Sequence, residues 1–524
     1  MIFTLFRFFR QLAVGWLLLF TSFGACANAV SGPADVLHWQ KFDGASFQQA
    51  QAEDKYLLLD LVAVWCHWCH VMEEKTYRDP RVVQLIQQHF VPVQADHDLR
   101  PDLAERYRDW GWPATIILRA DGTEIVKRAG YISPDKMARL LQAVIDDPSP
   151  EASTLSLPDQ LSSSPLLSSS GLKTLQRRHL EAYDAALGGL KLGQKFLDAE
   201  SVEWDLWLAQ HNDPAAAKRA VQTLTAARQL IDPEFGGAYQ YSTYGDWDHP
   251  HYEKIMKTQQ KFLNIYSQAC VQLKNTEDCQ AAREVGDYLI HFLFSPENGA
   301  FYTSQDADLV QGEKAHDYFS LKKKARLAIG LPRIDKHHYA AHNGRAIEGL
   351  ASLYLATQEK RYLEKALQAA TWVIKNRGYY GGGFRHDKRD AAGPYLADTL
   401  YMGKALLKLY EATGQKVFLS KASRAAEFIG KQFKNPDGGL LSAVDNGTPA
   451  QPLPQLDQNI DAARFFIRLF QQTGQLGQRA LAEHTMKFLA TDSVATARLT
   501  DAGILLVMQE YQAASVPTQS ALKP

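Results

Sequence analysis

Two cysteines separated by two residues form the part of the sequence best suited to chemistry. Cys66-His67-Trp68-Cys69 directly follows an apolar run and precedes a helical pattern. A helix start presents unpaired N–H groups and the positive end of the helix dipole, and both stabilise a thiolate. We therefore expect Cys66 to be the nucleophile. Cys69 would be the resolving thiol, because two intervening residues let it reach a mixed disulfide formed at Cys66.

Further residues are expected to support this dithiol. Asp60 lies six residues before Cys66, so strand alternation predicts that both side chains share a face and that Asp60 accepts the proton of Cys69. Trp112-Pro113 precedes another strand-like segment, where a cis proline would abut the dithiol and present backbone to an incoming peptide. The expected substrate contacts, which require access for a polypeptide, are Trp65, His67, Trp68, Trp112 and Pro113.

Three other interpretations of the cysteine pair remain open. Cys66 to His70 also spells C-x-x-C-H, the attachment motif for c-type haem, but haem would consume both thiols. A zinc site of Cys66, His67, Cys69 and His70 is disfavoured because four ligands so close in sequence cannot all converge from one helix start. A purely structural disulfide is the third. We expect dithiol exchange, with no metal and no cofactor.

Residues 35–147 have the pattern of a small α/β domain. A helical segment over 71–90 is interrupted at Asp79-Pro80, where proline suits the first position of a second helix. Residues 148–170 are rich in Ser, Pro and Leu without a period, which predicts a flexible linker. The expected strands cover residues 56–65, 90–95, 114–118 and 124–128.

Beyond Gly171 nearly every segment has a helical period, with apolar residues at i, i+3, i+4, i+7 and i+8. Short glycine elements recur between the helices, which predicts helical hairpins repeated around an axis. We expect an all-α toroid over 171–512 and a tail over 513–524, although an open array would show similar repeats. The glycine elements lie at residues 188–190, 236–239, 298–302, 381–384 and 437–440.

The helical part contains a second group of residues with chemical potential. His249, His251 and Glu253 alternate at spacing two, so an extended segment would place them on one face, as a metal or sugar site requires. A helix there would scatter them. Sugar-processing toroids use carboxylates or histidines at their mouth for acid/base work, whereas the alternative role of such residues is to cap helices and bind loops. The other candidates are Asp306, Asp308, His342, Asn343 and Asp398.

The first 29 residues have the pattern of a signal peptide. Arg7 and Arg10 precede an apolar stretch over 12–23 that is too short to span a bilayer, and Ala27-Asn28-Ala29 suits cleavage. This pattern predicts a periplasmic or secreted protein. It would be attached to a membrane only if Cys26 were lipidated as in a lipoprotein, or if the apolar stretch stayed as an anchor.

The net charge limits the possible partners, and two further cysteines remain to be assigned. The net charge is −1 and no basic run exceeds residues 322–324, so we expect no nucleic-acid partner. Cys270 and Cys279 flank a polar turn between two helical patterns. They could form a disulfide or remain separate buried thiols, and the spacing does not decide between these outcomes.

The motifs resemble known families. Residues 57–66 resemble the active-site strand of thioredoxins, including Asp60 and Trp65, and residues 74–82 resemble a helix of the C-terminal domain of the DsbD reductase. The whole pattern is similar to YyaL-type proteins, in which a thioredoxin-like domain precedes a six-hairpin (α/α) toroid. The segments that carry this similarity are 66–72, 111–113, 249–254, 299–302, 306–308 and 342–344.

The resemblance implies an α/β thioredoxin-like domain followed by an all-α (α/α)6 toroid. It implies an exported thiol-disulfide oxidoreductase that acts on a protein dithiol or disulfide, with the toroid binding a partner or ligand. The alternative is a carbohydrate isomerase or hydrolase with an accessory thioredoxin-like domain. His67-Trp68 replaces the Gly-Pro of thioredoxins, which leaves the direction of electron flow open.

Overall fold

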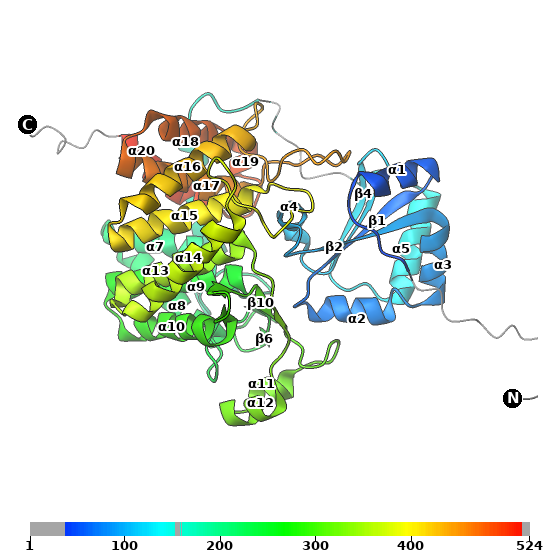
Figure 1. Ribbon diagram of the computed structural model, residues 1–524, viewed down its shortest axis with the longest axis horizontal. Coiled ribbons are helices and arrows are strands. Elements are labelled where there is room, and N and C mark those ends of the chain that lie inside the picture. Colours follow the sequence, from blue (N-terminus) through cyan, green and yellow to red (C-terminus); the bar gives the residue numbers. More distant parts are fainter. Residues whose placement is uncertain (1–36, 152–157, 159, 516–524) are drawn as a thin grey trace, which may run out of the picture.

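The computed structural model describes residues 37–151, 158 and 160–515. The expected signal peptide, including Cys26, lies outside these residues. Figure 1 shows a small α/β unit beside a larger helical unit. Among the described helices, none combines the length and apolar character that crossing a membrane requires.

The α/β unit is built on a four-stranded sheet in the order β2-β1-β3-β4, with β1 parallel to β2 and antiparallel to β3. Alternate residues of β1 enter two apolar clusters on opposite faces, with Leu58 on one face and Leu57 and Leu59 on the other. The strands are β1 Tyr56–Val62, β2 Phe90–Asp96, β3 Ala114–Leu118 and β4 Glu124–Ala129. The helices are α1 Gly44–Ala52, α2 His67–Lys75, α3 Pro80–His89, α4 Pro101–Arg106, η1 Arg108–Trp110 and α5 Pro134–Asp146.

The expected fold class is confirmed for this unit, with one difference in the first strand. We predicted strand over 56–65, but β1 ends at Val62. The chain then turns, since Cys66 N donates a hydrogen bond to Ala63 O, and α2 begins at His67. The predicted helix break is confirmed, because Asp79 caps α3 and Pro80 is its first residue.

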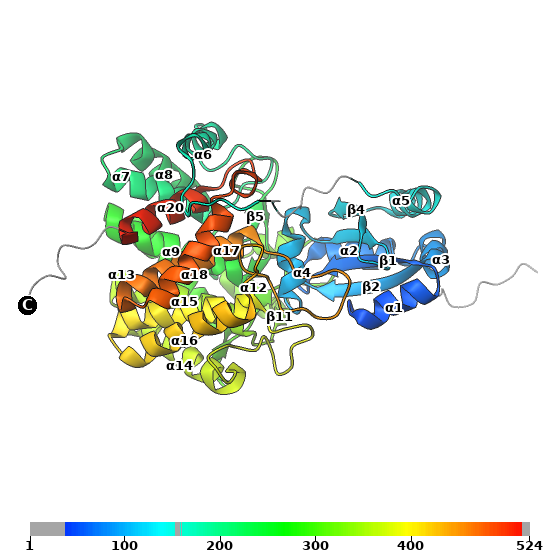
Figure 2. The ribbon, with the colours of Figure 1, turned by 90° about the horizontal axis from the view of Figure 1, so that it is seen from above.

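The helical unit is a closed ring of paired helices. Its inner helices contact one another in the circular order α7-α9-α13-α15-α17-α20-α7, which confirms a toroid and excludes an open array. The sixth hairpin pairs α6 with α20, so the first and last described helices of the ring close it (Figure 2). The inner helices are α7 Ala199–Gln210, α9 Met256–Leu273, α13 Ala340–Thr357, α15 Leu396–Thr413, α17 Leu456–Thr473 and α20 Ala502–Ser515. The outer helices are α6 Ser169–Ala182, α8 Pro214–Ala227, α10 Thr276–Tyr288, α14 Lys360–Arg377, α16 Lys416–Gln432 and α18 Leu476–Leu489.

Short elements fill the connections of the ring. Three small sheets pair β5 with β6, β8 with β9, and β10 with both β7 and β11. The strands are β5 Tyr241–Ser242, β6 Pro250–His251, β7 Lys254–Ile255, β8 Phe294–Ser295, β9 Ala300–Phe301, β10 Ser304–Gln305 and β11 Ile334–Asp335. The remaining helical turns are η2 Arg228–Leu230, η3 Leu289–Leu293, α11 His316–Ser320, α12 Lys323–Ile329 and α19 Asp492–Ala495.

A repeated hydrogen bond explains the glycine elements. In four hairpins the fourth residue of the inner helix binds the backbone of the residue that follows the glycine turn. Asn459, for example, accepts from Leu440 N at 2.7 Å and donates to Leu440 O at 3.1 Å. The other pairs are Gln259 with Ala238, Asn343 with Phe301 and Thr399 with Phe384. The glycine elements therefore anchor turns at the ends where the inner helices begin.

The two units share contacts at that end of the ring, with α4 of the α/β unit lying next to the helices (Figure 1). Lys257 forms an ion pair with Glu105 at 3.1 Å, and Arg106 donates to Gln451 O at 2.9 Å. Ala450 of the ring belongs to an apolar cluster of the α/β unit. Figure 2 shows the orange segment around residue 450 reaching across to this unit.

Two connecting segments differ from the expectation. Residues 160–168 fall in the predicted flexible linker, yet Leu161 and Leu166 pack against the ring core and Ser162 N binds Thr491 Oγ1 at 3.0 Å. Helix α20 continues to Ser515, although we expected the toroid to end at residue 512 and the tail to begin at residue 513. Cys270 and Cys279, whose state the sequence left open, form a disulfide that joins α9 to α10.

The turn-anchoring residues should be important for stability. Replacing Asn459 with Ala leaves the buried N–H and C=O of Leu440 without these partners, so we expect a loss of about 2–4 kcal/mol in the free energy of unfolding. Asn376→Ala is the control, because its exposed amide binds only Trp372 O in its own helix. Urea denaturation measures both variants, and equal losses would contradict the anchoring role.

Candidate functional site

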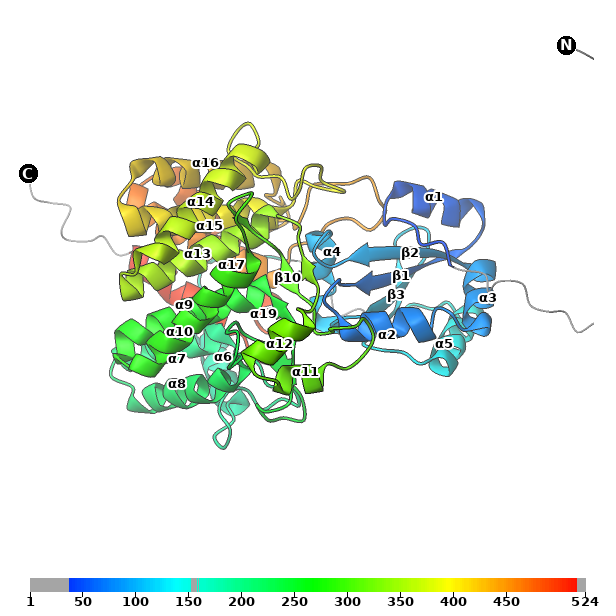
Figure 3. The same ribbon diagram turned by 60° about the horizontal axis from the view of Figure 1, so that its bottom comes forward.

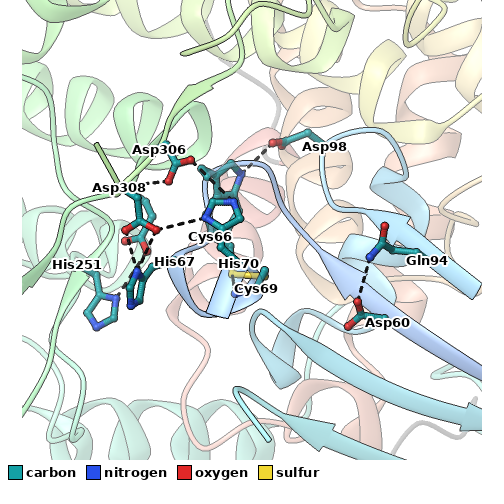
Figure 4. The surroundings of a disulfide bond; sticks show 12 residues. Asp60, Cys66, His67, Cys69, His70, Gln94, Asp98, His251, Asp306 and Asp308 are labelled. Carbon is teal, nitrogen blue, oxygen red and sulfur yellow. Dashed lines mark hydrogen bonds and ion pairs between the residues drawn. A yellow bond between two sulfur atoms is a disulfide. The ribbon is translucent and has the colours of Figure 1, made fainter. Parts of the chain in front are cut away.

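The cysteine pair lies at the start of α2. Cys66 is the N-cap residue of this helix, and its sulfur accepts a hydrogen bond from Cys69 N at 3.1 Å. The two sulfur atoms form a disulfide, with the Cα atoms 5.3 Å apart (Figure 4). After reduction, the same N–H group and the helix dipole would stabilise a thiolate at Cys66.

The ring covers the disulfide. Cys66 and Cys69 are only 3% and 4% exposed, and Ile255 of the ring packs against their cluster. Our expectation that a polypeptide reaches the sulfur atoms directly is therefore wrong for this arrangement. The physical reason is that the helix end carrying the dithiol faces the ring. In a separate thioredoxin-like domain, the same helix end would face solvent.

Asp60 lies on β1 and is 2% exposed. Burial raises the pKa of its carboxyl to about 7, although a hydrogen bond from Gln94 at 3.2 Å favours the ionised form. Figure 4 shows Asp60 and Gln94 on one side of the disulfide and the ring carboxylates on the other. Because β1 ends at Val62, strand alternation does not relate Asp60 to Cys66 as we predicted.

Trp65 is engaged inside the protein. Its indole N–H donates to Asp98 Oδ2 at 2.9 Å, and Asp98 Oδ1 bonds His342 of the ring at 2.9 Å. His386 of the ring also reaches the backbone oxygen of Asp98, at 2.6 Å. Trp65 is 2% exposed, so its predicted contact with a substrate is wrong in this arrangement.

The predicted cis peptide is present between Trp112 and Pro113. Trp112 packs against the cluster that contains both cysteines, and its ring lies 4.5 Å from that of His97. Pro113 is buried.

Helix α2 places two histidines toward the ring. His67 and His70 are three residues apart, so they share a face. The Nδ1 atoms of His67 and His70 lie 2.8 and 3.3 Å from the carboxylate of Asp308. His67 is thereby committed to the ring, and our prediction that it contacts substrate is wrong in this arrangement.

The segment after β10 also covers Trp68. Lys314 lies over the Trp68 ring at 6.0 Å, and Gly312 lies close to Glu74. Figures 1 and 3 both show this green segment beside α2.

Strand pairing brings the ring carboxylates together. Gln305 of β10 pairs with Lys254 of β7, so Asp306 follows β10 opposite Glu253, which precedes β7. Asp306 and Asp308 are 1% and 2% exposed. Burial raises the pKa of Asp306 to about 7. Burial opposes ionisation of Asp308 too, but hydrogen bonds from the two histidines lower its pKa.

The predicted residues of the ring separate into different environments. Asp306, Asp308, His251 and Glu253 lie near α2, and His251 Nδ1 is 3.7 Å from Glu253 Oε1. His249 is exposed and binds Asp246 instead.

Asn343 and Asp398 have structural contacts. Asn343 anchors Phe301, and Asp398 accepts from Ala341 N and bonds His386. A single site containing all eight predicted residues is therefore wrong, because these two side chains satisfy backbone groups and a buried histidine.

Sequence reasoning missed several residues that join the units. His70 was considered only as part of a haem motif, a disfavoured zinc site and a family resemblance, although its spacing of three from His67 indicated a shared helix face. Asp98, His386 and the pair of Glu105 with Lys257 carried no local signal, because their partners are far apart in sequence.

A cavity of about 610 Å³ lies within the ring, and Arg108 of the α/β unit contributes to its lining. Arg108 forms an ion pair with Asp457 of the ring. Most of the lining comes from inner helices and is rich in both charges, including Lys257, Arg345, Glu348, Lys404, Asp461 and Arg464.

Comparison with known proteins supports both units. Residues 30–146 match a thioredoxin-like DsbH family model described as a protein of unknown function, DUF255. Residues 313–452 match the model of glycosyl hydrolase family 88. D-mannose isomerase aligns with a TM-score of 0.50 and 13% identity over 66% of this chain and 98% of that one, which shows the helical fold alone.

Curated relatives match the chain at 21–28% identity. An uncharacterised protein of Caenorhabditis elegans is 21% identical over 78% of this chain and 73% of its own. Spermatogenesis-associated protein 20 of Homo sapiens is 27% identical over 52% of this chain, which spans only 39% of that protein. The thiol:disulfide interchange protein DsbD of Campylobacter jejuni is 28% identical over 18% of this chain and 17% of that one. The chain thus combines a thioredoxin-like domain with an (α/α) toroid.

Proposed function

We propose that the protein is an exported thiol-disulfide oxidoreductase whose toroid controls access to the dithiol. The observation that carries this proposal is a cysteine pair at the N-terminus of α2, with a buried carboxyl on the neighbouring strand. The likeness of part of the chain to DsbD supports it. Export is proposed from the sequence pattern of residues 1–29.

The exchange follows from the two sulfur atoms. In the reduced protein the Cys66 thiolate attacks a partner disulfide, which forms a mixed disulfide and releases one partner thiolate that takes up a proton. Cys69 then loses its proton to Asp60 and attacks Cys66 Sγ. This step releases the second partner thiol and forms the Cys66–Cys69 disulfide. Two electrons pass to the partner, and the reverse sequence oxidises a partner dithiol.

Burial of the disulfide means that a protein partner reacts when the two units separate. The Glu105–Lys257 ion pair helps to hold the α/β unit against the ring, and both residues are far from the cysteines in sequence. Substitutions at this ion pair can therefore weaken the interface without altering the dithiol.

Reversing one charge at this pair should accelerate exchange with a protein. Lys257→Glu places two carboxylates together, and we expect insulin reduction to become about tenfold faster, equivalent to roughly 1.4 kcal/mol of docking free energy. Lys257→Gln removes the attraction without adding a second carboxylate, so it should accelerate the reaction less than Lys257→Glu. Cys66→Ala should abolish the reaction in every background. A Cys66→Ala protein as active as the parent would falsify the proposal.

Asp60 gives the reaction a pH dependence. Above pH 7 the carboxylate can accept the Cys69 proton, so the single-turnover rate should rise as the pH passes through about 7. In Asp60→Asn the rate above pH 7 should fall by about tenfold or more, without this inflection. An unchanged inflection would assign the titration to another group.

The same substitution should raise stability at high pH. The folded pKa of Asp60 lies above the unfolded value of about 3.9, so between about pH 4 and 7 only the folded state retains the proton. Stability therefore falls in the parent as the pH rises through this window, and Asp60→Asn removes the penalty. Thermal unfolding should show the variant gaining on the parent from pH 4 to pH 8, which simple structural damage would not produce.

A second candidate function is carbohydrate processing in the toroid. The cavity within the ring favours it, because Glu348 and Asp461 both lie within 4 Å of Lys404 there, at 3.7 and 2.6 Å. Paired carboxylates suit acid/base work on sugars. The D-mannose isomerase likeness supplies the first substrate to test, namely D-mannose.

Isomerisation of D-mannose, followed by NMR in the whole protein, tests this candidate. We expect Glu348→Gln to reduce turnover by about a hundredfold if the cavity is the site. Asp306→Ala should retain it, because Asp306 does not line the cavity. Loss of turnover in Asp306→Ala alone would move the site to the interface, and no turnover of mannose by the parent would remove mannose as its substrate.

A further inference from the structure

A cluster of potential metal ligands lies at the interface between the two units. His70 comes from α2, and Asp306 and Asp308 come from the segment after β10. One ligand atom from each of these three side chains lies within 4.8 Å of the other two. Figure 4 shows the side chains converging beside the disulfide, with Asp60 on its other side.

The carboxylates in this cluster are buried without a lysine or arginine partner among the described residues. Asp306, Asp308 and Glu253 are 1%, 2% and 4% exposed, and their described ion-pair partners are histidines alone. Several carboxylates in a dry interface are costly unless cations compensate their charge. A bound divalent cation would provide that compensation.

One oxygen points to the place of the cation. Asp306 Oδ2 is buried and has no hydrogen-bond partner, and it faces His70 Nε2 at 4.0 Å. This separation is too long for a hydrogen bond. With bonds of about 2.0–2.2 Å, two ligands on one tetrahedral zinc ion lie roughly 3.4 Å apart, so a small side-chain movement would bring both atoms onto one ion. Glu253 Oε2 is also buried without a partner.

The other atoms of the cluster are already held in place. Asp306 Oδ1 accepts from Asp308 N at 3.0 Å, and Asp308 Oδ2 accepts from Gly312 N at 2.8 Å. His67 Nδ1 bonds Asp308 Oδ1 at 2.8 Å. Hydrogen bonds of this kind orient ligands in metal sites and tune their affinity.

We propose that His70, Asp306 and Asp308 bind a divalent transition-metal ion that links the thioredoxin-like domain to the toroid. One imidazole nitrogen with carboxylate oxygens suits Zn²⁺ or Mn²⁺ better than Ca²⁺ or Mg²⁺. The site differs from the zinc alternative weighed from the sequence, because it uses no cysteine and takes two ligands from the toroid. The site does not use the cysteines as ligands, so metal binding can be tested while Cys66 and Cys69 are bonded to each other.

Metal binding is tested on the oxidised whole protein, in which the disulfide removes the Cys66 and Cys69 thiolates as competing ligands. Calorimetric titration of the metal-stripped protein with zinc chloride should give one ion per chain. Bound zinc should also raise the unfolding temperature, because the ion binds only the docked, folded state. Asp306→Asn, which is close to isosteric, should weaken zinc binding by about tenfold or more and remove the thermal shift.

The chain offers a matched control. Asp246, Asp248 and His249 form an exposed cluster with similar ligand spacing. His249→Ala should leave zinc affinity unchanged, and His70→Gln should repeat the effect of Asp306→Asn if that variant folds poorly. The proposal is overturned if the oxidised parent binds no zinc, if Asp306→Asn and His70→Gln both bind like the parent, or if His249→Ala alone loses the ion.

Discussion

The contact between the start of α2 and the ring is the interaction on which the site depends. This helix end favours negative charge at Cys66, yet the ring presents the carboxylates of Asp306 and Asp308 to the same region. Carboxylates near a thiol oppose thiolate formation. His67, between the two cysteines, and His70, directly after them, both bind Asp308. These histidines therefore separate the acidic residues of the ring from the helix end that carries Cys66.

Further contacts between the two units hold the ring over the dithiol. Ala450 of the ring completes an apolar cluster of the smaller unit, and Asp98 is bound by His342 and His386 of the ring. Such contacts hold one relative position of the two units and account for the burial of both cysteines. In this respect the chain differs from a thioredoxin-like domain carried on a flexible linker.

Much of the fold was predictable because its signals are local. Residues close in sequence determine the helix break at Pro80, the strands that begin at Phe90 and Ala114, and the helical period beyond Gly171. The cysteine pair was placed correctly for the same reason. The grouping of Asp306 with His70, and the purely structural contacts of Asn343 and Asp398, were not predictable, because their partners come from distant segments or from the backbone.

Closure of the ring by its first and last helices has a consequence for synthesis. The α/β unit is complete by Asp146, whereas the ring cannot close until α20 has been made. Domains generally fold as units and the earlier one folds first. The cysteine pair is therefore accessible during synthesis, before the ring that covers it has closed.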